Sequence, residues 1–190
     1  MEDWNMATTR RQGRERTPAR KAPARRASTR KAPQEEASAL KVLQAYETGW
    51  KQVSGGTDAD VQAVEAQLGR RLPAALAEFL MTCGGGRPEK NFFVGPESEV
   101  LDLGIGYVLP LRDVGKKQGV GTTNETWRAH QGLPQELIPF AVDTGNANLI
   151  CLRLPQQDVI YWVHDEPDHR PRFVAASLPA FLHGLGECPF

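Results

Sequence analysis

The chain has 190 residues, of which 23 are Lys or Arg and 23 are Asp or Glu, so its formal net charge at pH 7 is zero. Hydrophobic residues make up 40% of it, enough for one ordinary domain with its own core. No run of about 18 apolar residues occurs, and no apolar stretch follows the first charged residues, so we expect neither a membrane span nor a secretory signal. These absences predict a cytoplasmic protein that makes no membrane contact.

The charges are unevenly distributed along the chain. Residues 10–31 hold ten basic residues and one acid, a net charge of +9, so the remainder carries −9. Residues 7–34 contain no Leu, Ile, Val, Phe, Trp or Tyr, and nothing there offsets the conformational entropy that folding would cost. We therefore expect residues 1–34 to be a disordered basic arm and residues 35–190 to form a single domain.

The basic arm admits several interpretations. Its charge suits weak contact with nucleic acid through residues 10–31, because phosphate neutralisation needs only clustered Lys and Arg. A solubilising tail, or translated sequence ahead of the true start, explains the same composition without a partner. From Met6 onward the segment is Arg-rich and poor in acids, like an organelle transit peptide, although Glu2 and Asp3 ahead of it oppose that interpretation.

Three helices are predicted at the start of the domain. The first runs from about residue 35 to the glycines at 55 and 56, on the apolar spacing of Leu43, Tyr46, Trp50 and Val53. Thr57 is a good N-cap for the second helix, and Gly69 suits the left-handed position after its last turn. Pro73 suits the first turn of the third helix. The apolar stripe of that helix is predicted to be Leu76, Phe79, Leu80 and Cys83.

Three consecutive glycines, residues 84–86, follow the third predicted helix. Glycine-rich phosphate cradles lie between a strand and the N-terminus of a helix, where the dipole favours an anion. Here the glycines follow the carbonyl end of a helix, which repels phosphate. We therefore interpret them as a helix stop that lets the chain reverse and enter a sheet.

Strand-like segments dominate the second half of the chain. Residues 90–95 form a short apolar run, residues 99–103 alternate, and residues 124–130 predict a short helix within an otherwise Gly-rich and polar region. Four β-like segments at 136–143, 147–155, 158–164 and 172–177 are joined by short turns, as in antiparallel hairpins. Ser177 is an N-cap for a closing helix that Gly186 stops. The order predicts an α+β domain with N-terminal helices, a mostly antiparallel central meander and a closing C-terminal helix.

No constellation of residues points to catalysis. His164 and His169 lie in "HDEPDH", which could serve a metal-dependent enzyme, but the spacing matches no zinc pattern and the segment is a predicted hairpin turn. Cys83, Cys151 and Cys188 are far apart and are expected to be reduced structural thiols. We therefore predict neither a catalytic residue nor a metal or other cofactor.

Carboxylates at strand ends and turns are the remaining candidates. A surface rich in them would steer a basic partner by electrostatic attraction. Asp143 is the best single candidate, and the alternative is that its side chain holds the turn in which it lies. The candidate partner-binding residues are Glu97, Glu99, Asp102, Asp143, Asp158, Asp165 and Glu166.

Several separated motifs resemble those of the SUKH superfamily. "VEAQLGRRLPAALAEFLMTCGGG" resembles its opening signature, in which a helix ends in Leu-Gly and Leu-Pro opens the next. "LPQELIPFAVDTGNANLICLRL" resembles the central strand, Asp/Gly turn and Cys-Leu strand, and "VIYWVHDEP" with "VAASLPAFLHGL" resembles the last hairpin and closing helix. Many members have an acid just before the Cys-Leu strand, where this chain has residues 146–148, Asn-Ala-Asn. The resemblance covers about residues 40–185 and excludes the arm.

This resemblance implies an α+β domain without catalytic activity. Bacterial members are commonly immunity proteins that block a polymorphic toxin, often a nuclease, inside the producing cell, and eukaryotic members include cell-wall regulators that act as interaction hubs. We thus expect a non-catalytic domain that binds a cognate, basic toxin. A regulatory scaffold with a nucleic-acid-binding arm is the alternative.

Overall fold

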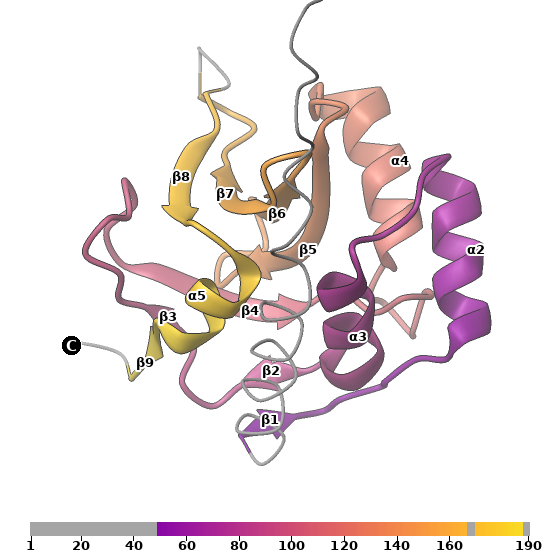
Figure 1. Cartoon of the computed structure of the whole chain (residues 1–190), viewed down its shortest axis with the longest axis horizontal. Coiled ribbons are helices and arrows are strands. Elements are labelled where there is room, and N and C mark those ends of the chain that lie inside the picture. The colour runs from indigo at the N-terminus through magenta and orange to yellow at the C-terminus, as the bar shows by residue number, and fades with distance from the viewer. Residues whose placement is uncertain (1–48, 167–169, 188–190) are drawn as a thin grey trace, which may run out of the picture. The chain divides into compact units, whose positions relative to one another are not determined.

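The computed structural model describes residues 49–166 and 170–187. In these ranges two helices precede a curled antiparallel sheet, a third helix interrupts the strands and a fourth follows them (Figure 1). The helices are α2 (Asp58–Leu68), α3 (Ala74–Cys83), α4 (Val120–Gln131) and α5 (Leu178–His183). The strands are β1 (Trp50–Lys51), β2 (Arg87–Pro88), β3 (Phe92–Phe93), β4 (Leu103–Val108), β5 (Leu137–Asp143), β6 (Leu149–Arg153), β7 (Asp158–Trp162), β8 (Arg172–Ala175) and β9 (Leu185–Gly186).

Seven strands form the main sheet in the order β8-β7-β6-β5-β4-β3-β9, and every neighbouring pair is antiparallel. From β3 to β8 the strands are neighbours in chain order, which confirms the predicted meander. The chain then crosses through α5 and returns as β9 beside β3. The predicted α+β class is therefore confirmed.

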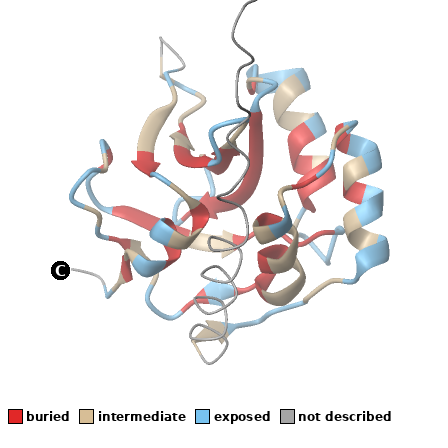
Figure 2. Cartoon of the chain, viewed as in Figure 1, coloured by how far each residue is buried: buried red, intermediate tan, exposed pale blue. Residues whose placement is uncertain are grey.

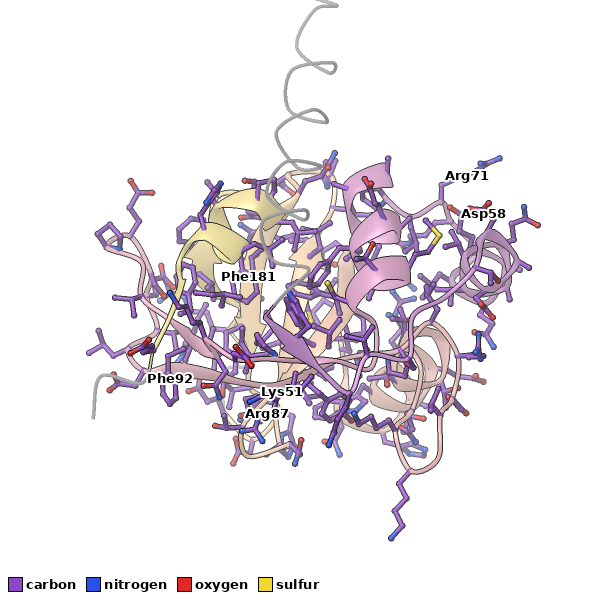
Figure 3. All side chains as sticks on the ribbon, turned by 90° about the horizontal axis from the view of Figure 1, so that it is seen from below. Lys51, Asp58, Arg71, Arg87, Phe92 and Phe181 are labelled. Atoms are coloured by element: carbon purple, nitrogen blue, oxygen red, sulfur yellow. The ribbon has the colours of Figure 1, made fainter. Side chains whose placement is uncertain are left out.

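The core lies where the helices meet β5, β6 and β7. The ring of Phe140 on β5 has Phe79 of α3 at 6.1 Å and Phe181 of α5 at 5.6 Å, while Trp127 of α4 contacts Trp162 of β7 at 5.6 Å. All of β5 and the first four residues of β6 are buried, as expected for central strands that are covered on both faces (Figure 2). Phe181 of α5 is buried in this core, whereas the charged residues labelled in Figure 3 are exposed.

The second predicted helix is confirmed with both of its ends. Thr57 and Asp60 form a capping box, in which the Thr57 amide donates to Asp60 Oδ2 at 2.8 Å and the Asp60 amide donates back to Thr57 Oγ1 at 3.3 Å. Gly69 closes the helix at φ +66°. Helix α3 is likewise confirmed, with Pro73 just before its first residue and its predicted apolar stripe fully buried.

The glycine run after α3 stops the helix, as predicted. The Gly84 amide donates to Leu80 O, the carbonyl oxygen of Gly84 accepts from Ser54, and Gly85 turns the chain at φ +78°. The Gly85 amide then donates to Val108 O and the Val108 amide to Gly86 O, both within 2.9 Å, so the turn leads directly onto the end of β4. These bonds occupy the carbonyl end of α3 with protein groups.

Trp50 and Val53 do not extend the first predicted helix, and this part of the prediction is wrong. Trp50 and Lys51 form β1, which pairs with β2, and the Trp50 ring packs edge-on against Phe79 at 5.6 Å. These tertiary contacts override the helical spacing of the apolar residues. The preceding part of that predicted helix, like the predicted arm, lies outside the described residues.

Two elements differ from their predictions in position or length, because glycines obscured them. The prediction placed a strand at 99–103, but β4 begins at Leu103 and runs through Gly104 and Gly106. A Cβ at Gly106 would lie 2.3 Å from the Asp143 carbonyl oxygen, so the close approach of β4 to the turn after β5 requires glycine. Helix α4 starts four residues before its prediction and includes Gly121, where Gln67 of α2 packs against the bare backbone.

Gly186 does not stop the closing helix, in contrast to the prediction. Helix α5 starts after its N-cap Ser177 as expected, but it ends at His183 with Gly184 as the cap. The next two residues, Leu185 and Gly186, pair with β3 instead. A Cβ at Gly184 would lie 2.3 Å from the Phe93 ring, so glycine is required there for the helix end to reach the sheet.

Candidate partner-binding site

Asp143, the best single candidate from the sequence, holds the turn between β5 and β6. Its Oδ1 accepts the amides of Ala147 and Asn148 at 2.9 and 3.3 Å, and its Oδ2 accepts Asn148 Nδ2 at 2.8 Å and the Tyr161 hydroxyl at 2.9 Å. The side chain is 9% exposed. Burial, followed by the hydrogen bond to Asp143, raises the pKa of Tyr161 to about 12. The carboxylate oxygens of Asp143 thus accept hydrogen bonds that stabilise the fold.

Asp158 is also engaged inside the domain. It forms a two-pronged ion pair with Arg153 across the β6–β7 hairpin, in which Arg153 Nε donates to Asp158 Oδ1 at 3.0 Å and Nη2 donates to Oδ2. The residue is 8% exposed. The hydrogen bond that Arg153 donates to Asp158 raises the pKa of Arg153 above its usual value. Such a pair stabilises the hairpin, and it leaves Asp158 less available to bind a partner.

The other five candidate acids lie on two segments that the fold brings together. Residues 94–102, the loop between β3 and β4, run beside the start of β8, which follows the turn after β7. The Glu99 amide donates to Phe173 O at 2.9 Å, and the Phe173 amide donates back to Glu99 Oε2 at 3.2 Å. Arg170 Nη2 approaches Glu99 Oε1 at 3.9 Å. Loop and hairpin are therefore joined through Glu99 by both backbone and side-chain contacts.

A charged cleft of about 340 Å³ opens at this junction. Its lining residues are Glu99 from the loop with Glu166, Arg170 and Arg172 from the hairpin. Glu166 and Arg172 form a further ion pair across the hairpin. The Glu166 side chain is one-quarter exposed and those of Glu99 and Arg170 are about half and two-thirds exposed, so the groups remain accessible to a partner.

Three predicted acids lie on the same two segments, within three residues in sequence of an acid that lines this cleft. Glu97 and Asp102 belong to the loop and Asp165 to the hairpin, and all three are exposed. None takes part in an ion pair within the described part of the chain. The fold thus gathers five of the seven candidate acids, two paired with arginines and three open to solvent.

The histidine cluster shows no metal geometry in the described segments. His164 stands edge-on to Trp127 at 5.5 Å, and its Nδ1 is buried without a hydrogen-bond partner. His169 lies outside the described residues. Across residues 49–166 and 170–187, no three His, Cys, Asp or Glu side chains are grouped closely enough to hold an ion.

Cys83 and Cys151 are buried thiols, as predicted. Cys151 lies on β6 among apolar neighbours, and burial raises the pKa of its thiol far above the usual range. A protonated, inaccessible thiol is a poor nucleophile. Cys188 lies outside the described residues.

Sequence reasoning missed the basic half of the cleft and the loop's apolar residues. Arg170 and Arg172 alternate in the sequence directly after the acidic turn, at the start of the next strand. This alternation was the signal from which the basic half of the cleft could have been predicted. Leu101 is 87% exposed, although it lies in a segment whose alternation predicted a strand. Only the departure of residues 94–102 from the sheet reveals it.

Two helices, a curled antiparallel meander and a closing helix define the class of the protein as an α+β domain. The chain belongs to the SMI1 / KNR4 family (SUKH-1), whose family model matches residues 55–184. This range contains both the β5–β6 turn and the charged cleft. The comparison with curated proteins found no match. Within the described ranges, no helix is both long and apolar enough to cross a membrane.

Proposed function

We propose that this protein is an immunity protein that neutralises a cognate toxin by direct binding. The observation that carries the proposal is its membership of the SMI1 / KNR4 family, whose bacterial members are commonly immunity proteins and which is generally non-catalytic. The engaged roles of Asp143, Asp158 and the buried cysteines support a binding role over a catalytic one. The toxin is expected to be basic, as nucleases are, and the encounter is expected in the cytoplasm.

The proposed binding surface is the charged cleft with the three acids near it in sequence. Glu97, Asp102 and Asp165 are exposed and form no ion pair with another described residue, so they can attract a basic surface without first breaking such a pair. The arginine-paired Glu99 and Glu166 offer hydrogen-bonding positions that the hairpin already orders. The proposal excludes Asp143 and Asp158, because removing either would disturb the fold before it disturbed a partner.

Co-expression with the toxin gene expected beside this one tests the function. Cells that express the toxin domain alone should stop growing, and cells that also express the full chain should grow. Absence of rescue by well-folded protein, or absence of a neighbouring toxin gene, would rule out the immunity role.

A pair of charge reversals tests the surface. Glu97→Lys and Asp165→Lys should each weaken rescue, since each places a cation where a basic partner approaches. Glu125→Lys is the matched control, because Glu125 is an exposed acid on α4, remote in sequence from the loop and the hairpin. Equal rescue by all three variants would show that the toxin binds elsewhere.

A regulatory scaffold with a nucleic-acid-binding arm is the second candidate. The net charge of +9 over residues 10–31 favours it. Retention on immobilised DNA should then fall steeply with salt, because each phosphate contact releases a counterion. Deleting residues 1–34 should abolish retention, and unchanged retention would exclude this role.

A further inference from the structure

Two exposed apolar side chains lie at the base of the β3–β4 loop. Phe93 and Leu103 form the last registered pair of the hairpin, so the adjacent Val94 and Asp102 leave the sheet together and Leu101 follows one residue beyond. Val94 is 63% exposed and Leu101 is 87% exposed. By comparison, the other large exposed apolar residues in the described ranges, Val53 and Val114, are 42% and 36% exposed.

The loop is held in place ahead of Leu101, and β4 begins two residues after it. At its start the Val94 amide donates to Gly184 O at 2.8 Å. In its middle Ser98 bonds Val100 through side-chain and backbone groups at 2.9 and 3.0 Å, and Val100 is buried. Glu99 is bonded to Phe173 as described above. A loop with these contacts presents Leu101 from a fixed base, which lowers the entropy cost of binding.

The residue that follows Leu101 has a left-handed backbone. Asp102 has φ +59°, in the left-handed region that few residues other than glycine, Asn and Asp adopt at low cost. This turn lets the chain enter β4 at Leu103, which is buried, while Leu101 stays in solvent. Residues on a regular strand alternate between faces, and the left-handed turn breaks that alternation here.

The segment that carries Leu101 is acidic in sequence. Residues 91–111 contain three acids, Glu97, Glu99 and Asp102, and no Lys or Arg. Of these three acids, Glu99 has Arg170 nearby, whereas Glu97 and Asp102 form no ion pair with any described residue. A partner that receives this loop needs an apolar recess with a basic rim.

We infer that Leu101 is the apolar anchor of the partner-binding surface, and that it inserts into a recess rimmed by Lys and Arg on a basic protein. The inference rests on the proposed function and adds the anchor residue and the chemistry of the partner's site. The charged cleft beside the loop then supplies the polar rim that surrounds a buried anchor in specific interfaces.

Titration of the purified full chain against the neighbouring toxin's C-terminal domain tests the anchor. Leu101→Ala should raise the Kd by about tenfold or more, since truncating a buried Leu removes most of its transfer free energy. Leu101→Met, which keeps a long apolar side chain, should stay within about threefold of the wild type. Val114→Ala is the control for trimming an exposed apolar residue elsewhere.

Charge around the anchor is tested by association kinetics. Asp102→Asn removes the charge while keeping a residue that tolerates positive φ, so the association rate should fall and become less sensitive to salt. Glu125→Gln, which removes a charge from α4, should leave the rate unchanged. Thermal unfolding of every variant checks that the domain is intact.

The outcomes separate the two proposals. Tight binding by the wild type with an unchanged Kd for Leu101→Ala would reject the anchor and keep the immunity role. No binding by the wild type would reject both. Weakening by Leu101→Ala, with Met rescue and no effect of Val114→Ala, would support the anchor.

Discussion

Gly85 shows how one residue joins three segments of the domain. Its backbone is left-handed, a Cβ there would lie 2.2 Å from Ser54 Oγ, and its carbonyl oxygen accepts Lys117 Nζ at 2.6 Å. Lys117 also lies 4.9 Å from the centre of the Tyr107 ring, a cation–π distance. The turn after α3 is therefore packed from two sides, and its missing side chain is a steric requirement.

Gly85→Ala should lower the free energy of unfolding by about 2–4 kcal/mol, from left-handed strain and the clash with Ser54 together. Gly132→Ala separates these causes, because Gly132 has φ +70° but no atom within 4 Å of an added Cβ. That variant should lose only about 1–2 kcal/mol. Urea unfolding measures both, and equal losses would contradict the steric argument.

Tyr161 links the β5–β6 turn to β7 through its hydroxyl. Because its pKa is raised to about 12 in the folded protein and is about 10 when unfolded, the folded state holds this proton more tightly. The stability it contributes is complete below pH 10 and is lost as the pH rises from about 10 through about 12. Tyr161→Phe should flatten that part of the pH–stability curve. Tyrosinate absorbance of wild type minus variant should show the late titration, and an ordinary pKa in that difference would contradict it.

At the scale of elements, hairpins and caps decide where the chain turns. The β6–β7 hairpin is closed by the ion pair of Arg153 and Asp158, and the β7–β8 hairpin by that of Arg172 and Glu166. The Asp158 side chain of the first pair is 11% exposed, against 25% for Glu166 in the second, while the arginine side chains are 34% and 40% exposed. The same chemistry thus serves stability in one hairpin and leaves accessible charge in the other.

Asp158→Asn should destabilise the domain by about 1–3 kcal/mol, because it weakens a charged hydrogen-bonded pair and leaves the Arg153 cation poorly compensated. Glu97→Gln, at an exposed acid without an ion pair, should change the stability by less than about 0.5 kcal/mol. Thermal unfolding of the two variants tests this contrast. Unchanged thermal unfolding of Asp158→Asn would show that the Arg153 side chain donates to water or to another acceptor.

For the whole molecule, the sequence was most informative where local and tertiary preferences agree. The cap at Thr57, the buried stripe of α3 and the four meander strands were predictable because periodicity and caps are local signals. The predictions around Trp50, Gly106 and Gly121 were wrong, because the local structure at each residue is determined by a neighbour distant in sequence. The same limit applied to the site. Acids at turns could be predicted from the sequence, but which of them are buried, which pair with arginine and which are exposed depends on which strands are neighbours.

We predict that the basic arm can be removed from the acidic remainder of the chain without unfolding the domain. Deleting residues 1–34 removes a net charge of +7 and should leave the midpoint of thermal unfolding unchanged, since the deleted segment lacks large apolar side chains from residue 7 onward. Calorimetry of both forms at equal ionic strength measures this. A markedly lower midpoint would place part of the arm in the folded unit.

The contact between Glu99 and Phe173 has a consequence for aggregation of the folded protein. Strand β8 lies at one edge of the sheet, where an open amide and carbonyl would template a strand from another molecule, and Glu99 occupies both of these groups on Phe173. The opposite edge is β9, only two residues long and followed by Glu187. Both ends of the sheet are thus poor nuclei for edge-to-edge polymerisation, so the folded domain is expected to resist aggregation through its strand edges at high concentration.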